Sequence, residues 1–315
     1  PNVSRLMHAI EMKIEGFNYP YPPYGGLSFH SLSSASAESQ FKAFVKRVYK
    51  SLGNSFLPIY RMADGEFAFL LGWRAPFTKS KRHGLSGSLH QMLGSVLRLI
   101  DQRTTTTTWG EAYTHEKKKL ALIKMENSIK YVSDKGILAL YFYERPDTWG
   151  EQYFAPMCNW FEAHNIVINV DNYVPFYFVY ALLNGPARKF LYSEKHVLVV
   201  TSLSEKRRNA ISASLYKEGA ASVQFLGISA NNSMFDEIDL STIHRPIDFA
   251  LIAAGIGSVN ILQQLESLAV PCIDCGICIE CLIEPERRHE RPFLMEISDN
   301  DTTVSKLPFI SKKCL

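Results

Sequence analysis

Residues 56–60 read Phe-Leu-Pro-Ile-Tyr, and residues 61–67 read Arg-Met-Ala-Asp-Gly-Glu-Phe. The apolar run predicts a strand, and two carboxylates, Asp64 and Glu66, follow its end across a glycine. In an open α/β sheet, ligands bind in the crevice at the carboxyl ends of the strands. Two close carboxylates repel each other, and burying them together is costly unless a cation such as Mg²⁺ or Mn²⁺ is present. The stretch therefore predicts a candidate metal site.

The rest of the chain predicts the fold around this stretch. Strands and helices alternate at short spacing over residues 56–275, which indicates a doubly wound, mostly parallel α/β sheet of the Rossmann-like type. The continuous apolar run at 196–201 suits a strand that is buried on both faces. We expect an irregular leader over 1–35, an α/β domain over 36–283 whose first helix is capped by Ser36, and a C-terminal arm over 284–315.

Composition limits the function classes. The 315 residues carry a net charge of only +3, which gives no support to a nucleic-acid partner. We find no apolar stretch approaching the roughly 20 residues of a membrane-spanning helix. We also find no charged region followed by an apolar core at the start of the chain. Six cysteines, four of them within 272–281, do not resemble a disulfide framework, so we expect a reducing, cytoplasmic compartment.

The Asp-Gly-Glu turn has two interpretations. It can hold a divalent ion against a diphosphate. Alternatively, Asp64 can cap the next helix, with Glu66 placed favourably in its first turn. Spacing alone favours the helix cap, because short motifs often match by chance.

The pattern Arg-x-x-Asp-Gly-Glu-Phe after a strand resembles the signature of the GT-D-fold glycosyltransferases. These are bacterial enzymes that were first catalogued as a domain of unknown function. The resemblance implies that Asp64 and Glu66 bind Mn²⁺ or Mg²⁺, which holds a nucleotide-sugar diphosphate. It also implies that Arg61 is the motif arginine, placed to pair with a carboxylate or a phosphate.

Residues 249–258 read Phe-Ala-Leu-Ile-Ala-Ala-Gly-Ile-Gly-Ser, a predicted strand that enters a turn at a helix start. Free N–H groups there suit an anion or a sugar hydroxyl, and a tight turn capped by Ser258 fits equally. The turn is similar to the family's C-terminal glycine turn, which an Ile-Asp-x-Gly strand end follows; here Asp274 and Gly276 match. The resemblance implies catalytic carboxylates at Asp274 and, with a shift in spacing, at Glu280. It implies donor contacts from Arg61, Gly65, Gly255, Gly257 and Ser258.

Four cysteines offer a rival hypothesis, because Cys272, Cys275, Cys278 and Cys281 repeat at every third residue. That spacing suggests an iron–sulfur cluster or a zinc site. Read as one extended strand, however, the segment divides these cysteines two and two between opposite faces and places Asp274 and Glu280 on one face. We therefore favour packing over a cluster.

The predicted function is a metal-dependent glycosyltransferase of the hexosyltransferase type. It would move a sugar from a nucleotide-sugar donor, for which the resemblance suggests a UDP-sugar, to a glycan or glycosylated acceptor. Lys81 and Arg82, in a basic loop, could clamp the donor diphosphate or lie in solvent. Two alternatives stay open: a cysteine-ligated iron–sulfur or zinc protein, and a nucleotide-binding module without turnover. An oligomer is compatible with the sequence.

Overall fold

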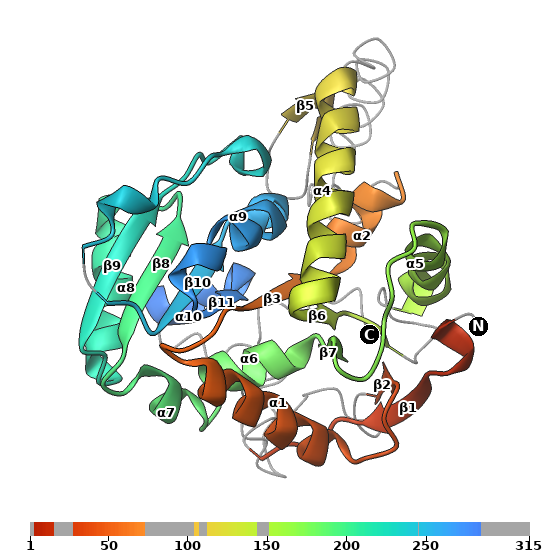
Figure 1. Ribbon diagram of the computed structural model, residues 1–315, viewed down its shortest axis with the longest axis horizontal. Coiled ribbons are helices and arrows are strands. Elements are labelled where there is room, and N and C mark those ends of the chain that lie inside the picture. The colour runs from red at the N-terminus through yellow and green to blue at the C-terminus, as the bar shows by residue number, and fades with distance from the viewer. Residues whose placement is uncertain are drawn as a thin grey trace, which may run out of the picture.

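The computed structural model describes residues 3–15, 28–72, 104–106, 112–143, 151–244 and 246–284. Its centre is a seven-stranded sheet in the order β7-β6-β3-β11-β10-β8-β9, in which every neighbouring pair is parallel (Figure 1). The strands are β3 (Leu57–Met62), β6 (Ile137–Leu140), β7 (Tyr173–Pro175), β8 (His196–Thr201), β9 (Ser222–Gly227), β10 (Phe249–Ala253) and β11 (Pro271–Asp274).

Helices cover both faces of this sheet. One face packs against α1 (Ala37–Ser51), α6 (Tyr177–Asn184), α7 (Arg188–Tyr192), α8 (Glu205–Lys217) and α10 (Glu280–Ile283). The other packs against α2 (Asp64–Leu70), α4 (His115–Lys135), α5 (Glu151–Ala163) and α9 (Ser258–Gln264). Figure 1 shows α4 and α9 above the sheet and α1 and α6 below it. The predicted doubly wound α/β fold is confirmed.

The burial of the strands follows from these two layers. In β3, Ile59 faces the α1 layer and Tyr60 faces the α4 layer, and all six residues of the strand are buried. Arg61 is the exception in chemistry, since it is a charged side chain in a strand that is otherwise apolar. An ionised group in such a place needs partners, because burial of an unpaired charge is costly.

Shorter elements surround the sheet. β1 (His8–Glu11) pairs antiparallel with β2 (Ser28–Ser31), and β4 (Thr104–Thr106) pairs antiparallel with β5 (Ala112–Thr114). The expectation of an irregular leader over 1–35 therefore misses one strand pair, whose four-residue strands are too short to show a clear pattern. The 3₁₀ turns are η1 (Val3–Arg5), η3 (Ser233–Phe235), η4 (Leu240–Thr242), η5 (Gly255–Gly257), η6 (Glu266–Leu268) and η7 (Gly276–Ile279).

The start of α1 confirms the predicted cap, because the Ser36 hydroxyl accepts the Ser39 N–H at 3.3 Å. Residues 166–170, an apolar run broken by Asn169, lie outside the sheet, and β7 begins after them at Tyr173. Buried Asn172 explains this placement: its side-chain amide donates to the carbonyls of Ser133 and Val167 at 2.9 and 2.7 Å. These bonds hold 166–170 as an irregular segment rather than in the sheet.

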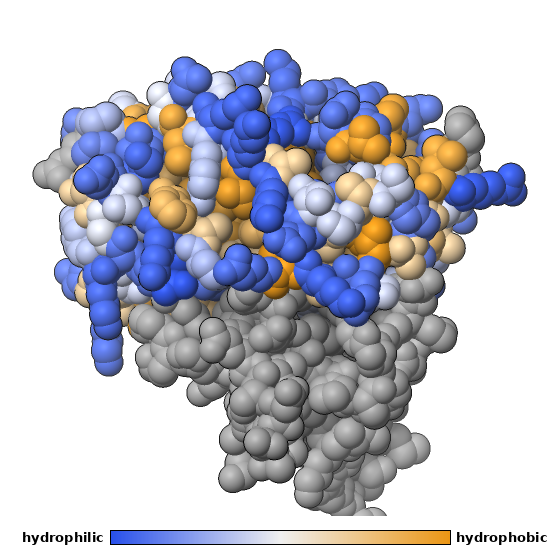
Figure 2. Space-filling model, turned by 90° about the horizontal axis from the view of Figure 1, so that it is seen from below, coloured by the Kyte–Doolittle hydropathy of each residue, from blue (hydrophilic) through white to orange (hydrophobic). Residues whose placement is uncertain are grey.

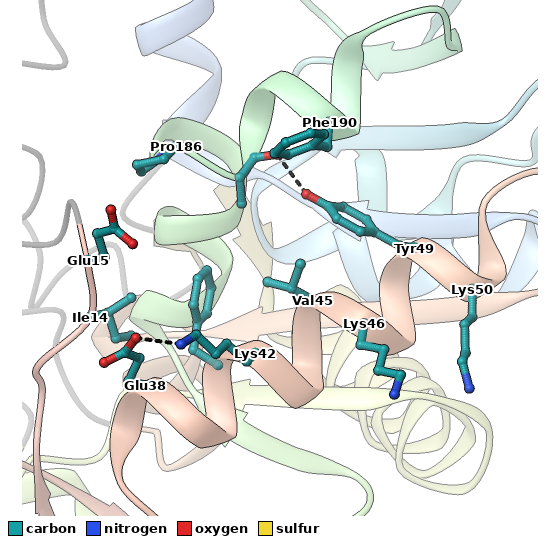
Figure 3. Close-up of a pocket in the computed structure, with 12 residues that line it drawn as sticks. Ile14, Glu15, Glu38, Lys42, Val45, Lys46, Tyr49, Lys50, Pro186 and Phe190 are labelled. Carbon is teal, nitrogen blue, oxygen red and sulfur yellow. Dashed lines mark hydrogen bonds and ion pairs between the residues drawn. The ribbon is translucent and has the colours of Figure 1, made fainter.

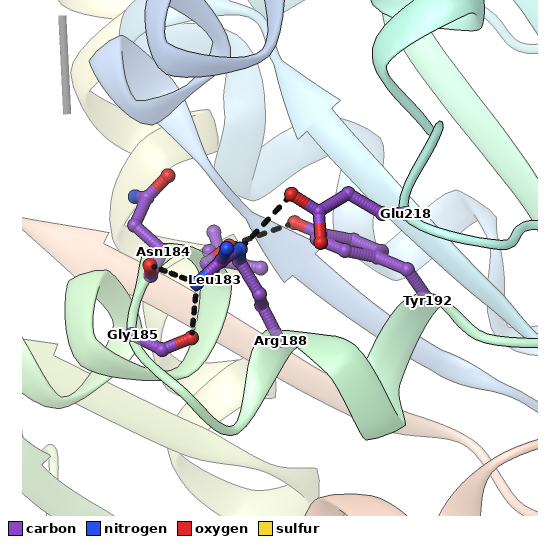
Figure 4. Close-up of polar contacts among 6 residues, drawn as sticks. All are labelled: Leu183, Asn184, Gly185, Arg188, Tyr192 and Glu218. Atoms are coloured by element: carbon purple, nitrogen blue, oxygen red, sulfur yellow. Dashed lines mark hydrogen bonds and ion pairs between the residues drawn. The ribbon is translucent and has the colours of Figure 1, made fainter. Parts of the chain in front are cut away.

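A polar network centred on Arg188 connects helix ends at the side of the sheet where β8 and β9 begin. Arg188 lies at the start of α7, just before β8, and its Nε donates to Glu218 at 3.0 Å (Figure 4). Its Nη1 donates to the carbonyls of Asn184 and Gly185, each at 3.2 Å, which are the last carbonyls of α6. Arg188 thus caps one helix and ties it to the end of α8.

Across the described residues, the helices are all too short or too polar to span a membrane.

Candidate functional site

The Asp-Gly-Glu turn forms the start of α2, directly after the carboxyl end of β3. Asp64 is the first helical residue, and Glu66 reaches back so that its Oε2 accepts the Ala63 N–H at 3.0 Å. The helix-cap interpretation is therefore correct for Glu66, although the capped position is Ala63 rather than Asp64. One Glu66 oxygen and the Asp64 carboxylate remain outside that bond, so the capping role does not exclude ligand binding.

Arg61 ties the end of β3 to the end of β11. Its backbone N–H donates to Asp274 Oδ2 at 3.3 Å, and its Nε donates to the Asp274 carbonyl at 3.0 Å. The guanidinium carbon lies 4.8 Å from the ring centre of Phe176 and 4.9 Å from that of Tyr180. Its Nη1 is buried and has no hydrogen-bond partner among the described residues. Arg61 therefore compensates a buried carboxylate and keeps one donor unused.

Gly276 makes room for this arrangement. Its φ is +42°, and a Cβ at this position would lie 1.7 Å from Arg61 Nη2. The Gly276 N–H donates to Asp274 Oδ1 at 3.2 Å. We call Arg61, Asp274 and Gly276 the latch. Only glycine fits here, because both the backbone angle and the space exclude a side chain.

Three carboxylates at this edge are hard to ionise. Burial raises the pKa of Glu66 to about 7; the Ala63 N–H bond opposes this, and the Asp274 charge adds to it. Burial raises the pKa of Asp274 to about 6, although Arg61 and the Ser258 hydroxyl bond pull it down. Burial also raises the pKa of Asp64. Desolvated acids with perturbed pKa values at a strand end are typical of functional sites.

The Gly-Ile-Gly-Ser turn follows β10 beside the latch. The Ser258 hydroxyl is fully buried, accepts the Ala254 N–H at 3.3 Å and bonds to Asp274. Gly257 packs against the backbone of η3, where a Cβ would lie 2.6 Å from Met234 N. Ser258 thus supports Asp274, and the tight-turn interpretation describes its contacts. A donor-binding role for Gly255, Gly257 and Ser258 stays a prediction.

Glu280 lies away from Asp274. It begins α10, and both of its oxygens lie near Arg207 Nη2 of α8, at 2.5 and 2.6 Å. The expectation that Asp274 and Glu280 share one strand face is wrong, because β11 ends at Asp274 and the positive φ of Gly276 turns the chain into η7 and α10. Its predicted catalytic role stays a prediction.

The turn at Gly276 also corrects the expectation that the four cysteines lie along one extended strand. Cys272 packs in the α4 layer, whereas Cys275 and Cys278 pack in the α1 layer, so the sheet itself separates them. The thiol of Cys275 donates to the Ile252 carbonyl at 3.1 Å. All four cysteines are buried, and the described part of the chain has no group of three or more His, Cys, Asp or Glu side chains able to hold a metal. Packing accounts for these four residues.

The absence of such a group among the described residues also limits the number of protein ligands that a divalent ion at α2 could have. Within the described ranges, Asp64 and Glu66 supply at most two protein carboxylates. Two carboxylates are hard oxygen donors, and Mg²⁺ is often held by one or two of them together with substrate phosphates and water. Burial is the main cause of the raised pKa values of Asp64 and Glu66, so a bound cation would stabilise their charged forms. The donor chemistry therefore fits an ion whose coordination a ligand completes.

A groove of about 540 Å³ lies elsewhere, between α1 and the α6–α7 junction (Figure 3). Phe41 and Val45 of α1 and Phe190 of α7 line it, and Lys42, Lys46 and Lys50 follow its edge. Seen from below in Figure 2, the molecule mixes hydrophobic and hydrophilic residues. The groove belongs to the α1 layer, whereas α2 and its carboxylates belong to the other layer. None of the predicted site residues that the structure describes lines this groove.

No protein-family model and no curated protein sequence matches the chain. Among solved structures, it is similar to one described as "The highly conserved domain of unknown function 1792 has a distinct glycosyltransferase fold", at 14% identity and a TM-score of 0.44, over 82% of this chain and 88% of that one. It is also similar to "A New Glycosyltransferase (DUF1792) from Streptococcus sanguinis", at 15% identity and a TM-score of 0.42, over 75% and 79%. At values this low, the role of each residue rests on its own contacts.

Several residues at this edge were not found from the sequence. Tyr60 is fully buried, and its hydroxyl has no hydrogen-bond partner among the described residues. Phe176 and Tyr180 form the aromatic faces for Arg61, and their spacing of four on a helix is the signal that could have paired them. Lys81 and Arg82 lie outside the described residues.

Proposed function

We propose that this protein is a metal-dependent glycosyltransferase that uses a nucleotide-sugar donor. The observation that supports it is a pair of desolvated carboxylates, Asp64 and Glu66, at the carboxyl end of a central parallel strand. The surrounding motif, Arg61 to Phe67, resembles the GT-D signature. A parallel sheet places such a pair where ligands bind. A UDP-sugar donor and a glycan or glycosylated acceptor are the finer parts of this proposal.

In this proposal, each residue has a separate role. Asp64 and the Glu66 oxygen that does not accept the Ala63 N–H would hold the ion, and the ion would act as a Lewis acid that neutralises charge on the diphosphate leaving group. Asp274 positions Arg61, whose Nη1 is buried and has no hydrogen-bond partner among the described residues. The base for the acceptor hydroxyl is one of the two predicted carboxylates, Asp274 or Glu280.

The test is release of UDP from a panel of UDP-sugars, measured with and without Mn²⁺. We expect Asp64→Asn and Glu66→Gln each to remove the Mn²⁺-stimulated release. Glu38→Gln is the matched control, because Glu38 is a surface residue of α1 that pairs with Lys42 at 2.7 Å. Full activity in the Asp64→Asn, Glu66→Gln double variant would overturn the proposal. Binding of UDP without any release would point to the module without turnover.

A further inference from the structure

Three lysines of α4 lie on aromatic rings. Lys117 Nζ is 5.4 Å from the ring centre of Tyr113 and 5.3 Å from that of Phe235. Lys124 Nζ is 5.7 Å from the same Phe235 ring. Lys118 Nζ is 5.7 Å from the ring of Phe69. All three lysines are half-buried. We call Lys117, Lys124 and Phe235 the basic wall.

The rings hold these ammonium groups without neutralising them. A cation over an aromatic face is attracted by the ring quadrupole but keeps its full charge. None of the ion pairs found among the described residues involves Lys117, Lys118 or Lys124. The nearest acid to Phe235 along the chain, Asp236, accepts the Ser229 N–H at 2.6 Å. The positive charges of Lys117 and Lys124 repel each other over one ring, so a bound anion would stabilise the basic wall.

The basic wall lies on the same side of the sheet as the candidate site. Phe69 belongs to α2, the helix that Asp64 and Glu66 begin. Its ring is 5.9 Å from Tyr113, and Tyr113 is 6.3 Å from Phe235. Phe235 lies in η3, which follows the carboxyl end of β9 and packs on η5 and α9. A row of three aromatic rings therefore connects the C-terminal part of α2, the helix that the two acids begin, to the lysines.

We propose that Lys117 and Lys124, held by Phe235, form a binding site for the phosphate groups of a ligand. Ammonium groups bind phosphate as mobile point charges with three donors each. A ligand that reaches from the acids of α2 to the basic wall would carry both a metal-binding and a lysine-binding phosphate oxygen. The inference rests on the proposed function only for the identity of that ligand, a nucleoside diphosphate.

The test is calorimetric titration of the full chain with inorganic pyrophosphate, UDP and uridine. We expect Lys117→Ala, Lys124→Ala together to weaken pyrophosphate and UDP binding at least tenfold, with the loss shrinking at high salt. Lys119→Ala is the matched control, because Lys119 is an exposed lysine of the same helix, and we expect less than a twofold change. Phe235→Leu keeps the charges of Lys117 and Lys124 but removes the ring that positions them, so we expect a loss of pyrophosphate affinity between those of the other two variants.

Each outcome has a definite meaning. Unchanged pyrophosphate binding in the double lysine variant, or no pyrophosphate binding by the wild-type chain, overturns the inference. Tighter binding of UDP than of pyrophosphate identifies a nucleotide, and equal binding identifies the phosphate groups alone; both support the site. If lysine-dependent binding is seen but no UDP-sugar is turned over, the proposed function fails and the phosphate site stands.

Discussion

An arginine lies beside a carboxylate residue at each end of the parallel strands, and the two arrangements differ: Arg188 forms an ion pair with Glu218, whereas Arg61 bonds to Asp274 through its backbone N–H and through the Asp274 carbonyl. At the amino edge, Arg188 engages Glu218 and two helix-end carbonyls, and its side chain is 23% exposed. At the carboxyl edge, Arg61 is 7% exposed, and its Nη1 has no described partner. Arg188 links the ends of two helices, whereas Arg61 is a buried cation beside acids whose pKa values are raised by burial. Desolvated acids with raised pKa values are what distinguish the candidate site from the structural contact.

Replacing each arginine by methionine tests this comparison most strongly. Arg61→Met leaves Asp274 buried without its compensating charge, so we expect a loss of ~4 kcal/mol in the free energy of unfolding. Arg188→Met removes a partly exposed pair, and we expect a loss of about 1 kcal/mol. Urea denaturation measures both. Equal losses would show that the two edges do not differ as described.

A substitution of Gly276 tests the contribution of the latch to stability independently of Arg61. Gly276→Ala introduces a Cβ into the space of Arg61 Nη2 at a positive φ, and we expect a loss of ~3 kcal/mol. Gly72→Ala is the control, since Gly72 has a φ of +68° and no atom of the described residues lies within 4 Å of its added Cβ. Only the backbone cost, about 1 kcal/mol, should appear there. If both variants lose the same amount in thermal unfolding, the steric part of the latch is absent.

The pH dependence of stability tests whether Glu66 is buried with a raised pKa. The pKa of Glu66 is raised from 4.5 to about 7 in the folded chain, so the unfolded chain loses its proton first. The stability that Glu66 contributes is full below pH 4.5 and is lost as the pH rises to about 7. Glu66→Gln should therefore raise the unfolding free energy at pH 8 by up to ~3 kcal/mol relative to its effect at pH 4.5. A pH profile of stability that is unchanged from the wild type would refute the buried acid.

The smallest effect on stability comes from the carboxylates of two ion pairs. Glu280→Gln and Glu218→Gln should each cost less than about 1 kcal/mol, because both pairs are partly exposed. Turnover separates them: if Glu280 is the base, UDP release falls ~100-fold in Glu280→Gln alone. Unchanged release would leave Asp274 as the candidate base.

Local patterns predicted much of this molecule. The apolar run before Arg61, the Ser36 cap and the alternation of strand and helix all follow from residues close in sequence, and the structure confirms them. The cysteine segment was predicted wrongly beyond Asp274. A period of two in Ile and Cys looked like a strand, but one glycine with a positive φ turned it into helix. Local pattern does not reveal such a turn, because the constraint on Gly276 comes from Arg61, more than 200 residues away.

The sequence by itself determined the α/β class, the end of β3 and the two carboxylates that follow it, because hydrophobic period and turn chemistry are local. Only the tertiary structure decided what those groups experience. The pairing of β3 with β11 places Asp274 beside Arg61. One Glu66 oxygen accepts the Ala63 N–H, and Glu280 forms an ion pair with Arg207. The physical reason is that desolvation and charge pairing depend on which strands lie side by side, and neighbours in a sheet need not be neighbours in the chain.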